Sequence, residues 1–193
     1  MAGTFEDFVT DYYAQFAQSV LDFGKGPLKD VLAVFDQVMA DGGTLWVAGN
    51  GGSAGIANHI VCDCSKGTYL EGHPPLRTVS LSANTPLLTA LGNDIGYDAV
   101  FSEPLKYYLQ DKDALLVVSS SGNSPNVVAA CDYANAKGVP TVAFVGFKGG
   151  RLAEIAKHVV HVPVDNYGIV EDIHMSVIHV LTQYIRGRSE GAF

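Results

Sequence analysis

The stretch "VAGNGGSAGIANH", residues 47–59, is an apolar run that stops in Asn, Gly and Ser and then resumes at helical spacing. A second stretch of the same kind, "VVSSSGNSPNVV", spans residues 117–128. Each pattern predicts a buried strand, a polar loop and the first turn of a helix. Two such units in one chain indicate a parallel sheet, because a crossover helix returns the chain to the start of the next parallel strand.

The same alternation of apolar strands and helical stripes continues outward from these two units. We expect strands within residues 44–49, 77–83, 114–120, 140–147 and 158–164. We expect helices within residues 5–23, 27–39, from 53 onward, and within 86–93, 126–138, 150–157 and 169–186. This order predicts an α/β fold: a doubly wound, five-stranded parallel sheet, in the flavodoxin-like order 2-1-3-4-5, with helices on both faces.

The chain has no interdomain linker pattern, so we interpret residues 1–193 as a single domain. Residues 1–41 would hold two N-terminal helices, residues 42–187 the α/β core, and residues 188–193 a frayed tail. The N-terminal helices carry more aromatic side chains than covering one sheet face requires. Aromatic residues are enriched where chains meet, so we expect part of this surface to be a subunit interface.

The charge and composition of the chain limit the kinds of molecule that it is expected to bind. The formal net charge is −8 and the sequence pI is about 5.0, which disfavours nucleic acid and anionic membranes because both attract basic surfaces. No apolar run reaches the roughly 18 residues of a membrane span. The first residues, "MAGTFEDFVTDYY", are acidic, unlike a signal peptide, and three cysteines are too few for a disulfide framework. These features predict a cytoplasmic protein with reduced thiols.

The two polar loops would meet at one crevice. In the order 2-1-3-4-5, strands 1 and 3 are neighbours whose connections leave in opposite directions, and ligands bind at that switch point. Helix N-termini, glycines and serine hydroxyls can hold a phosphate there without a lysine. The candidate residues are Asn50, Gly51, Gly52, Ser53, Ser119, Ser120, Ser121 and Ser124. The alternative is that both loops are only caps and turns, whose usual residues are the same.

The motifs "GNGGSA", "GND" and "SSSGNS", with a late "EDIH…H" helix, resemble the sugar isomerase (SIS) domain family over nearly the whole chain. Within it the chain is most similar to phosphoheptose isomerases, which convert sedoheptulose 7-phosphate into D-glycero-D-manno-heptose 7-phosphate. The resemblance implies a homotetramer with active sites between subunits and one zinc ion per subunit. It also implies that Ser53, Ser119, Ser121 and Ser124 hold the sugar phosphate.

The chemistry needs a base near two adjacent carbons and an acid or metal at the carbonyl oxygen. His59 and Asp63 share a helix face, and Glu171 and His179 lie eight apart on the last helix. The resemblance brings these four together as metal ligands and assigns acid–base roles to Asp63 and His179. It makes Asp94 a catalytic or substrate-hydroxyl helper. The predicted substrate contacts further include Asn93, Asp94 and Glu171.

Three positions depart from the pattern of the family. Asp63 stands where the family has Glu, Glu171 stands where it has Gln, and Lys66 lies one place before the position of a family Arg. The Asp63 carboxylate reaches about 1.5 Å less than a Glu would. These departures keep two alternatives open. One is a non-catalytic SIS protein that binds a phosphosugar and regulates, and the other is an isomerase of a C5, C6 or C8 phosphosugar.

Overall fold

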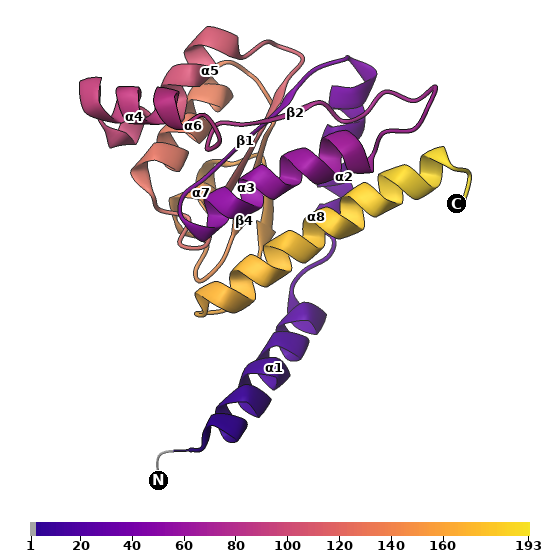
Figure 1. The fold of residues 1–193 in the computed structure, drawn as a ribbon, viewed down its shortest axis with the longest axis vertical. Helices are drawn as coiled ribbons and strands as arrows, with labels where there is room; N and C mark the ends of the chain where they lie inside the picture. The colour runs from indigo at the N-terminus through magenta and orange to yellow at the C-terminus, as the bar shows by residue number, and fades with distance from the viewer. Residues whose placement is uncertain (1–2) are drawn as a thin grey trace.

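Residues 3–193 are described by the structure, a computed structural model, and they form a five-stranded sheet with helices on both faces (Figure 1). All strand pairs are parallel, in the order β2-β1-β3-β4-β5, which confirms the predicted topology. The strands are β1 (Leu45–Gly49), β2 (Thr78–Ser80), β3 (Ala114–Ser119), β4 (Thr141–Val145) and β5 (His158–His161). The helices are α1 (Phe5–Asp22), α2 (Pro27–Ala40), α3 (Gly52–Cys62), α4 (Thr85–Asp94), α5 (Ser102–Tyr108), α6 (Pro125–Ala136), α7 (Gly150–Ile155) and α8 (Tyr167–Ser189).

Successive side chains of a strand point to opposite sides of the sheet. In the central strands both sets of side chains are buried, each in its own hydrophobic cluster. Leu45 and Val47 of β1 pack into a cluster with α2, α3 and α8. Trp46 and Ala48 pack into a second cluster with α5, α6 and α7. The sheet is therefore a middle layer between two helical layers, and continuously apolar strands follow from that position.

The last helix differs from its prediction at both ends. Asn166 caps α8 by accepting from the Ile169 backbone N–H at 3.3 Å, so the helix begins at Tyr167. At its other end the helix continues to Ser189, and the Phe193 ring stacks on Tyr184 with centroids 5.2 Å apart. Residues 188 and 189, which were predicted to belong to a frayed tail, are therefore part of the helix.

Besides a 3₁₀ turn at Tyr97–Ala99, two further elements were not predicted from the sequence. One is α5, whose buried Leu105 packs into the second core cluster. The other is a π-helical turn, Asp63–Gly67, that continues α3 and is closed by the Thr68 hydroxyl donating to the Cys64 carbonyl. Such turns are rare and concentrate at functional sites. Here the turn sets the position of Asp63.

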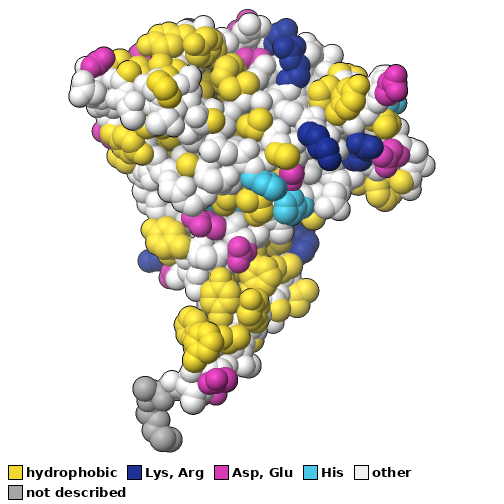
Figure 2. Space-filling model, viewed as in Figure 1, with side chains coloured by type: hydrophobic (Ala, Val, Ile, Leu, Met, Phe, Trp, Pro, Cys, Tyr) yellow, Lys and Arg dark blue, Asp and Glu magenta, His cyan; other side chains and the backbone are white. Residues whose placement is uncertain are grey.

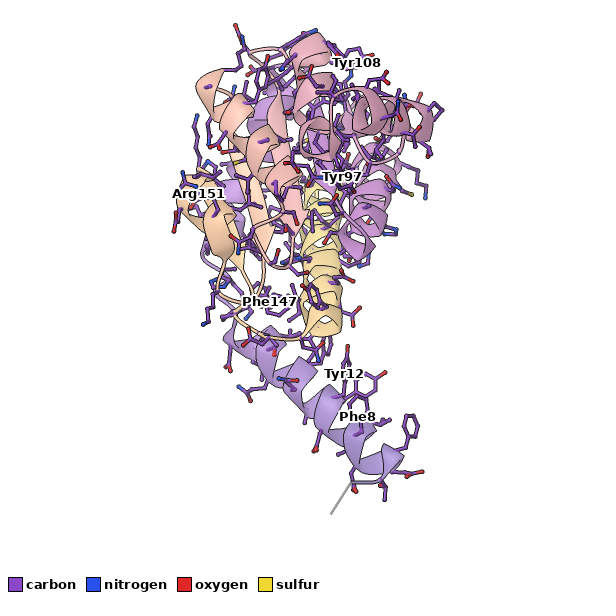
Figure 3. The ribbon with its side chains drawn as sticks, turned by 90° about the vertical axis from the view of Figure 1, so that its left-hand side faces the viewer. Phe8, Tyr12, Tyr97, Tyr108, Phe147 and Arg151 are labelled. Atoms are coloured by element: carbon purple, nitrogen blue, oxygen red, sulfur yellow. The ribbon has the colours of Figure 1, made fainter. Side chains whose placement is uncertain are left out.

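Helix α1 extends away from the sheet and its companion layers (Figure 1). Its aromatic side chains remain largely uncovered: Phe5 is 75% exposed and Phe8 is 64% exposed. Figure 3 shows Phe8 and Tyr12 projecting from the same side of this helix. An apolar stripe of this extent on a helix with few neighbours is typical of a surface that another chain covers.

The buried His174 on α8 predicts acid sensitivity of the fold. Its Nε2 lies 3.2 Å from the Val145 carbonyl, and burial lowers the pKa of the ring from 6.5 to about 4. Below about pH 6.5 the unfolded chain binds a proton here that the folded chain refuses until about pH 4. The free energy of unfolding should therefore fall by about 3 kcal/mol as the pH drops through this window.

Urea unfolding between pH 7.5 and pH 4 measures this loss of stability. His174→Gln removes the titrating ring, so the variant should lose about 3 kcal/mol less than the original chain over the same interval. Equal pH dependence in the two proteins would contradict the assignment.

Candidate active site

A cavity of about 310 Å³ opens at the carboxyl ends of β1 and β3. The two polar loops form its walls, as predicted. Its lining includes all eight loop residues predicted to hold a phosphate: Asn50, Gly51, Gly52, Ser53, Ser119, Ser120, Ser121 and Ser124. It also includes Val118, Tyr167 and Glu171. We refer to this cavity as the crevice.

The loop after β3 is arranged to present hydrogen-bond donors to the crevice. The Ser119 hydroxyl accepts from the Gly122 backbone N–H at 3.2 Å, and the Ser121 hydroxyl accepts from the Asn123 N–H at 3.3 Å. The buried Ser120 hydroxyl has no hydrogen-bond partner among residues 3–193. Buried hydroxyls without partners are uncommon, and this one belongs to a residue that lines the crevice.

Backbone conformation brings this loop close to the loop that follows β4. Gly122 has φ +66°, and a Cβ at this position would lie 2.0 Å from the Gly149 carbonyl oxygen. The backbone N–H groups of Gly146 and Leu152 donate to the carbonyls of Ser120 and Gly122, both at 2.9 Å. The loops after β3 and β4 are therefore packed together beside the crevice.

A separate cluster of three polar side chains joins α3, its π-helical turn and α8. The Nε2 atoms of His59 and His179 lie 3.2 Å apart. One carboxylate oxygen of Asp63 is 3.3 Å from His59 Nε2, and the other is 3.3 Å from His179 Nε2. Figure 2 shows adjacent histidine side chains beside acidic groups near the middle of the visible face.

This cluster suits a metal ion. One ligand atom from each of the three side chains can be chosen so that all lie within 4.8 Å of one another. Ligands of a tetrahedral zinc ion, at about 2.0–2.1 Å from the metal, stand roughly 3.3 Å apart. The distances of His59, Asp63 and His179 match that separation. Three protein ligands would leave a fourth position open, as catalytic zinc sites do.

Glu171 was predicted to be the fourth ligand, and the structure does not bring it to this cluster. Its carboxylate lies over Gly52, where a Cβ would come within 2.3 Å of the Glu171 Oε2 atom. The reason is distance: eight residues of helix separate Glu171 from His179 by about 12 Å along the axis. Glu171 instead lines the crevice, as its predicted substrate contact requires. Burial, with a smaller effect of Asp172, raises the pKa of its carboxyl group.

Asn93 and Asp94 lie at the end of α4, outside the crevice lining. Both side chains are exposed, and the Asn93 amide donates to the Asp94 carboxylate at 2.8 Å. The structure therefore does not place Asp94 beside the cluster or the crevice of its own chain. Lys66, one of the departures from the family pattern, is exposed on the π-helical turn.

Sequence reasoning missed four residues around these sites. Tyr167 lines the crevice, and Gln183 and Arg186 line a second cavity of about 350 Å³ that also contains Asp63 and His179. Asn126 is buried and bonds to Asn50. Asn126 had one detectable signal, because it directly follows the Ser-Pro that opens α6. Tyr167, Gln183 and Arg186 had no such signal, because only the path of α8 in the folded chain brings them to these cavities.

Comparisons with known proteins agree with this geometry. Residues 10–146 match the family model of the SIS domain. The phosphoheptose isomerase of Akkermansia muciniphila is 34% identical over 160 residues, 83% of this chain and 84% of the relative. That of Rhodospirillum rubrum is 38% identical over 140 residues, covering 72% and 74%. The solved phosphoheptose isomerase from Neisseria gonorrhoeae has a TM-score of 0.86 at 28% identity, over 94% of this chain and 98% of that one.

A parallel sheet in this order, with serine loops at its switch point, is the architecture of a SIS domain. The chain belongs to the SIS domain family and, within it, to the branch of the phosphoheptose isomerases.

Proposed function

We propose that this protein is an aldose–ketose isomerase that converts sedoheptulose 7-phosphate into D-glycero-D-manno-heptose 7-phosphate. The observation that carries the proposal is that α3 and α8 each contribute to both sites. The crevice includes Ser53 and Glu171, and the cluster includes His59 and His179, from the same two helices. A molecule held by its phosphate in the crevice would extend along α8 toward the cluster.

The spacing between the two sites favours a long sugar phosphate. Glu171 in the crevice and His179 in the cluster are about 12 Å apart along α8. An extended seven-carbon chain with its phosphate spans roughly 10 Å, at about 1.5 Å for each bond. A three-carbon sugar phosphate would be too short to occupy both sites. This argument supports a C7 substrate over the much shorter ones.

Asp63 and His179 are the groups positioned to move protons between the adjacent carbons and their oxygens. A base removes the proton from C1 of the ketose, and an acid protonates the carbonyl oxygen, which gives an enediol. Protonation of C2, with loss of the O1–H proton to form the C1 carbonyl, completes the aldose. The contact between the Asp63 carboxylate and His179 Nε2 lets the carboxylate orient the imidazole.

We also propose one zinc ion per subunit, held by His59, Asp63 and His179. When bound, the ion supplies a Lewis acid that polarises the substrate carbonyl. A residue that binds a metal tightly is a poor base, so Asp63 and His179 would serve catalysis best if they hold the ion loosely. The family resemblance further supports a cytoplasmic homotetramer, in which the exposed aromatic side chains of α1 would be covered by a second copy.

An assay with sedoheptulose 7-phosphate tests this function. The protein, purified with zinc, should form the aldose, and a chelator should reduce turnover until zinc is returned. Zinc at a hundredfold excess over its Kd should also raise the free energy of unfolding by about 2.7 kcal/mol, and His59→Ala should show a much smaller rise.

Two other outcomes would change the assignment. Binding of phosphosugars without turnover of any C5 to C8 ketose would indicate a binding or regulatory protein. Turnover of a C5, C6 or C8 phosphosugar in preference to the C7 ketose would correct the substrate.

A further inference from the structure

The buried Asn126 is in contact with the loop that forms the opposite wall of the crevice. It is the second residue of α6, directly after the serine loop, and it is 1% exposed. Its side-chain amide pairs with that of Asn50, which directly follows β1 and lines the crevice. The two residues exchange hydrogen bonds of 2.8 and 2.9 Å. This pair links the two phosphate loops directly.

The backbone fixes which way each amide faces. The Val127 N–H can only donate, so the Asn126 atom 2.9 Å from it must be the oxygen. The amide nitrogen of Asn126 then faces the oxygen of Asn50 at 2.9 Å, and its own oxygen accepts from the Asn50 nitrogen at 2.8 Å. The orientation of Asn50 is thus set through Asn126 by one backbone N–H.

Tyr97 reinforces the same orientation from a third segment. Its hydroxyl donates to the Asn50 Oδ1 atom at 3.0 Å, so that oxygen receives two donors. Tyr97 lies three residues beyond Asp94, on a segment otherwise outside the crevice (labelled in Figure 3). With its oxygen occupied, Asn50 keeps one Nδ2 hydrogen that has no acceptor among residues 3–193. A phosphate needs such a donor, because its oxygens act chiefly as acceptors.

We propose that Asn126, with Tyr97, is a positioning residue that holds Asn50 so that it offers an N–H to the phosphate of the substrate. This inference rests on one part of the proposed function, namely that the crevice binds the phosphate of the substrate. It does not depend on the isomerase reaction. Without the pair, the Asn50 amide could turn and present its carbonyl oxygen, which repels phosphate.

A double-mutant cycle with inorganic phosphate as the probe tests the inference, with binding followed by titration calorimetry. Asn126→Ala should weaken phosphate binding about tenfold or more, the effect of losing one hydrogen bond to a charged group. In an Asn50→Ala background the same change should have an effect of less than about twofold, because Asn126 acts through Asn50. An equal loss in both backgrounds, or no loss in the first, would overturn the proposal.

Tyr97→Phe provides a milder arm in case Asn126→Ala fails to fold. It should weaken phosphate binding by about two- to fivefold, again only when Asn50 is present. Tyr107→Phe is the matched control, because Tyr107 is also exposed, lies on α5, and donates its hydroxyl to Glu103 and not to Asn50. No effect of Tyr97→Phe, or an effect equal to that of Tyr107→Phe, would count against the proposed role of Tyr97.

Steady-state kinetics separate this role from the proposed function. With sedoheptulose 7-phosphate, Asn126→Ala should raise KM more than it lowers kcat, since a phosphate contact is made equally before and during the reaction. If the unaltered protein shows no turnover, the function fails while the phosphate titration still decides the role of Asn126. A selective loss of kcat at constant KM would contradict positioning of the phosphate site.

Discussion

His179→Ala is expected to lower kcat for the C7 ketose phosphate by about 10²- to 10⁴-fold, the range that one general acid–base group contributes. His179 contacts both other members of the cluster, at 3.2 Å to His59 and 3.3 Å to Asp63. Its removal therefore takes away a proposed proton-transfer group and one of three candidate metal ligands together. The crevice is untouched, so binding of inorganic phosphate should change by less than about twofold.

The control for this experiment is His73→Ala. His73 is exposed in the loop between α3 and β2, and it belongs to neither the crevice nor the cluster. Its replacement should leave kcat within about twofold, as for a surface position without special contacts. Full activity of His179→Ala would remove the cluster from the mechanism.

Gly122→Ala is expected to destabilise the fold and weaken phosphate binding together. The new Cβ would lie 2.0 Å from the Gly149 carbonyl oxygen, at a residue with φ +66°. Overpacking and the left-handed conformation together should cost about 3 kcal/mol or more. For a chain of this size, that corresponds to a fall in Tm of roughly 6–12 °C.

Gly55→Ala is the matched control, because it adds the same methyl group next to the same site. Gly55 lies inside α3, and a Cβ there meets nothing within 4 Å. Alanine favours helix by about 0.5–1 kcal/mol over glycine, so this variant should be slightly more stable. Equal Tm values for the two variants would show that the close packing at Gly122 does not constrain the loops.

The topology of the sheet could be predicted because its signals are local. Continuously apolar strands such as β3, followed by polar loops and helix starts, define parallel strands and their direction. The position of the crevice then follows from strand order, and all eight loop residues line it. No helix among residues 3–193 has the length and apolar character that crossing a membrane needs.

The features of the site that could not be predicted depend on the course of the chain in the folded protein. Glu171 and His179 lie on roughly one side of α8, but spacing does not reveal that the helix carries them to two different sites. Asp94 stands in a recognisable motif, yet its side chain bonds to Asn93 on the surface of this chain. The role of Asn126 depends on a contact across 76 positions of sequence. Amide pairs of this kind have no periodic signature.

The central claim is that the two sites act on one molecule and move a proton between adjacent carbons through an enediol. The most direct test is the reaction of sedoheptulose 7-phosphate in D₂O with the zinc-supplied protein, followed by NMR of the product. We predict D-glycero-D-manno-heptose 7-phosphate that carries solvent deuterium at C2. No aldose from this ketose with zinc present, or deuterium at a carbon other than C1 or C2, would contradict the account.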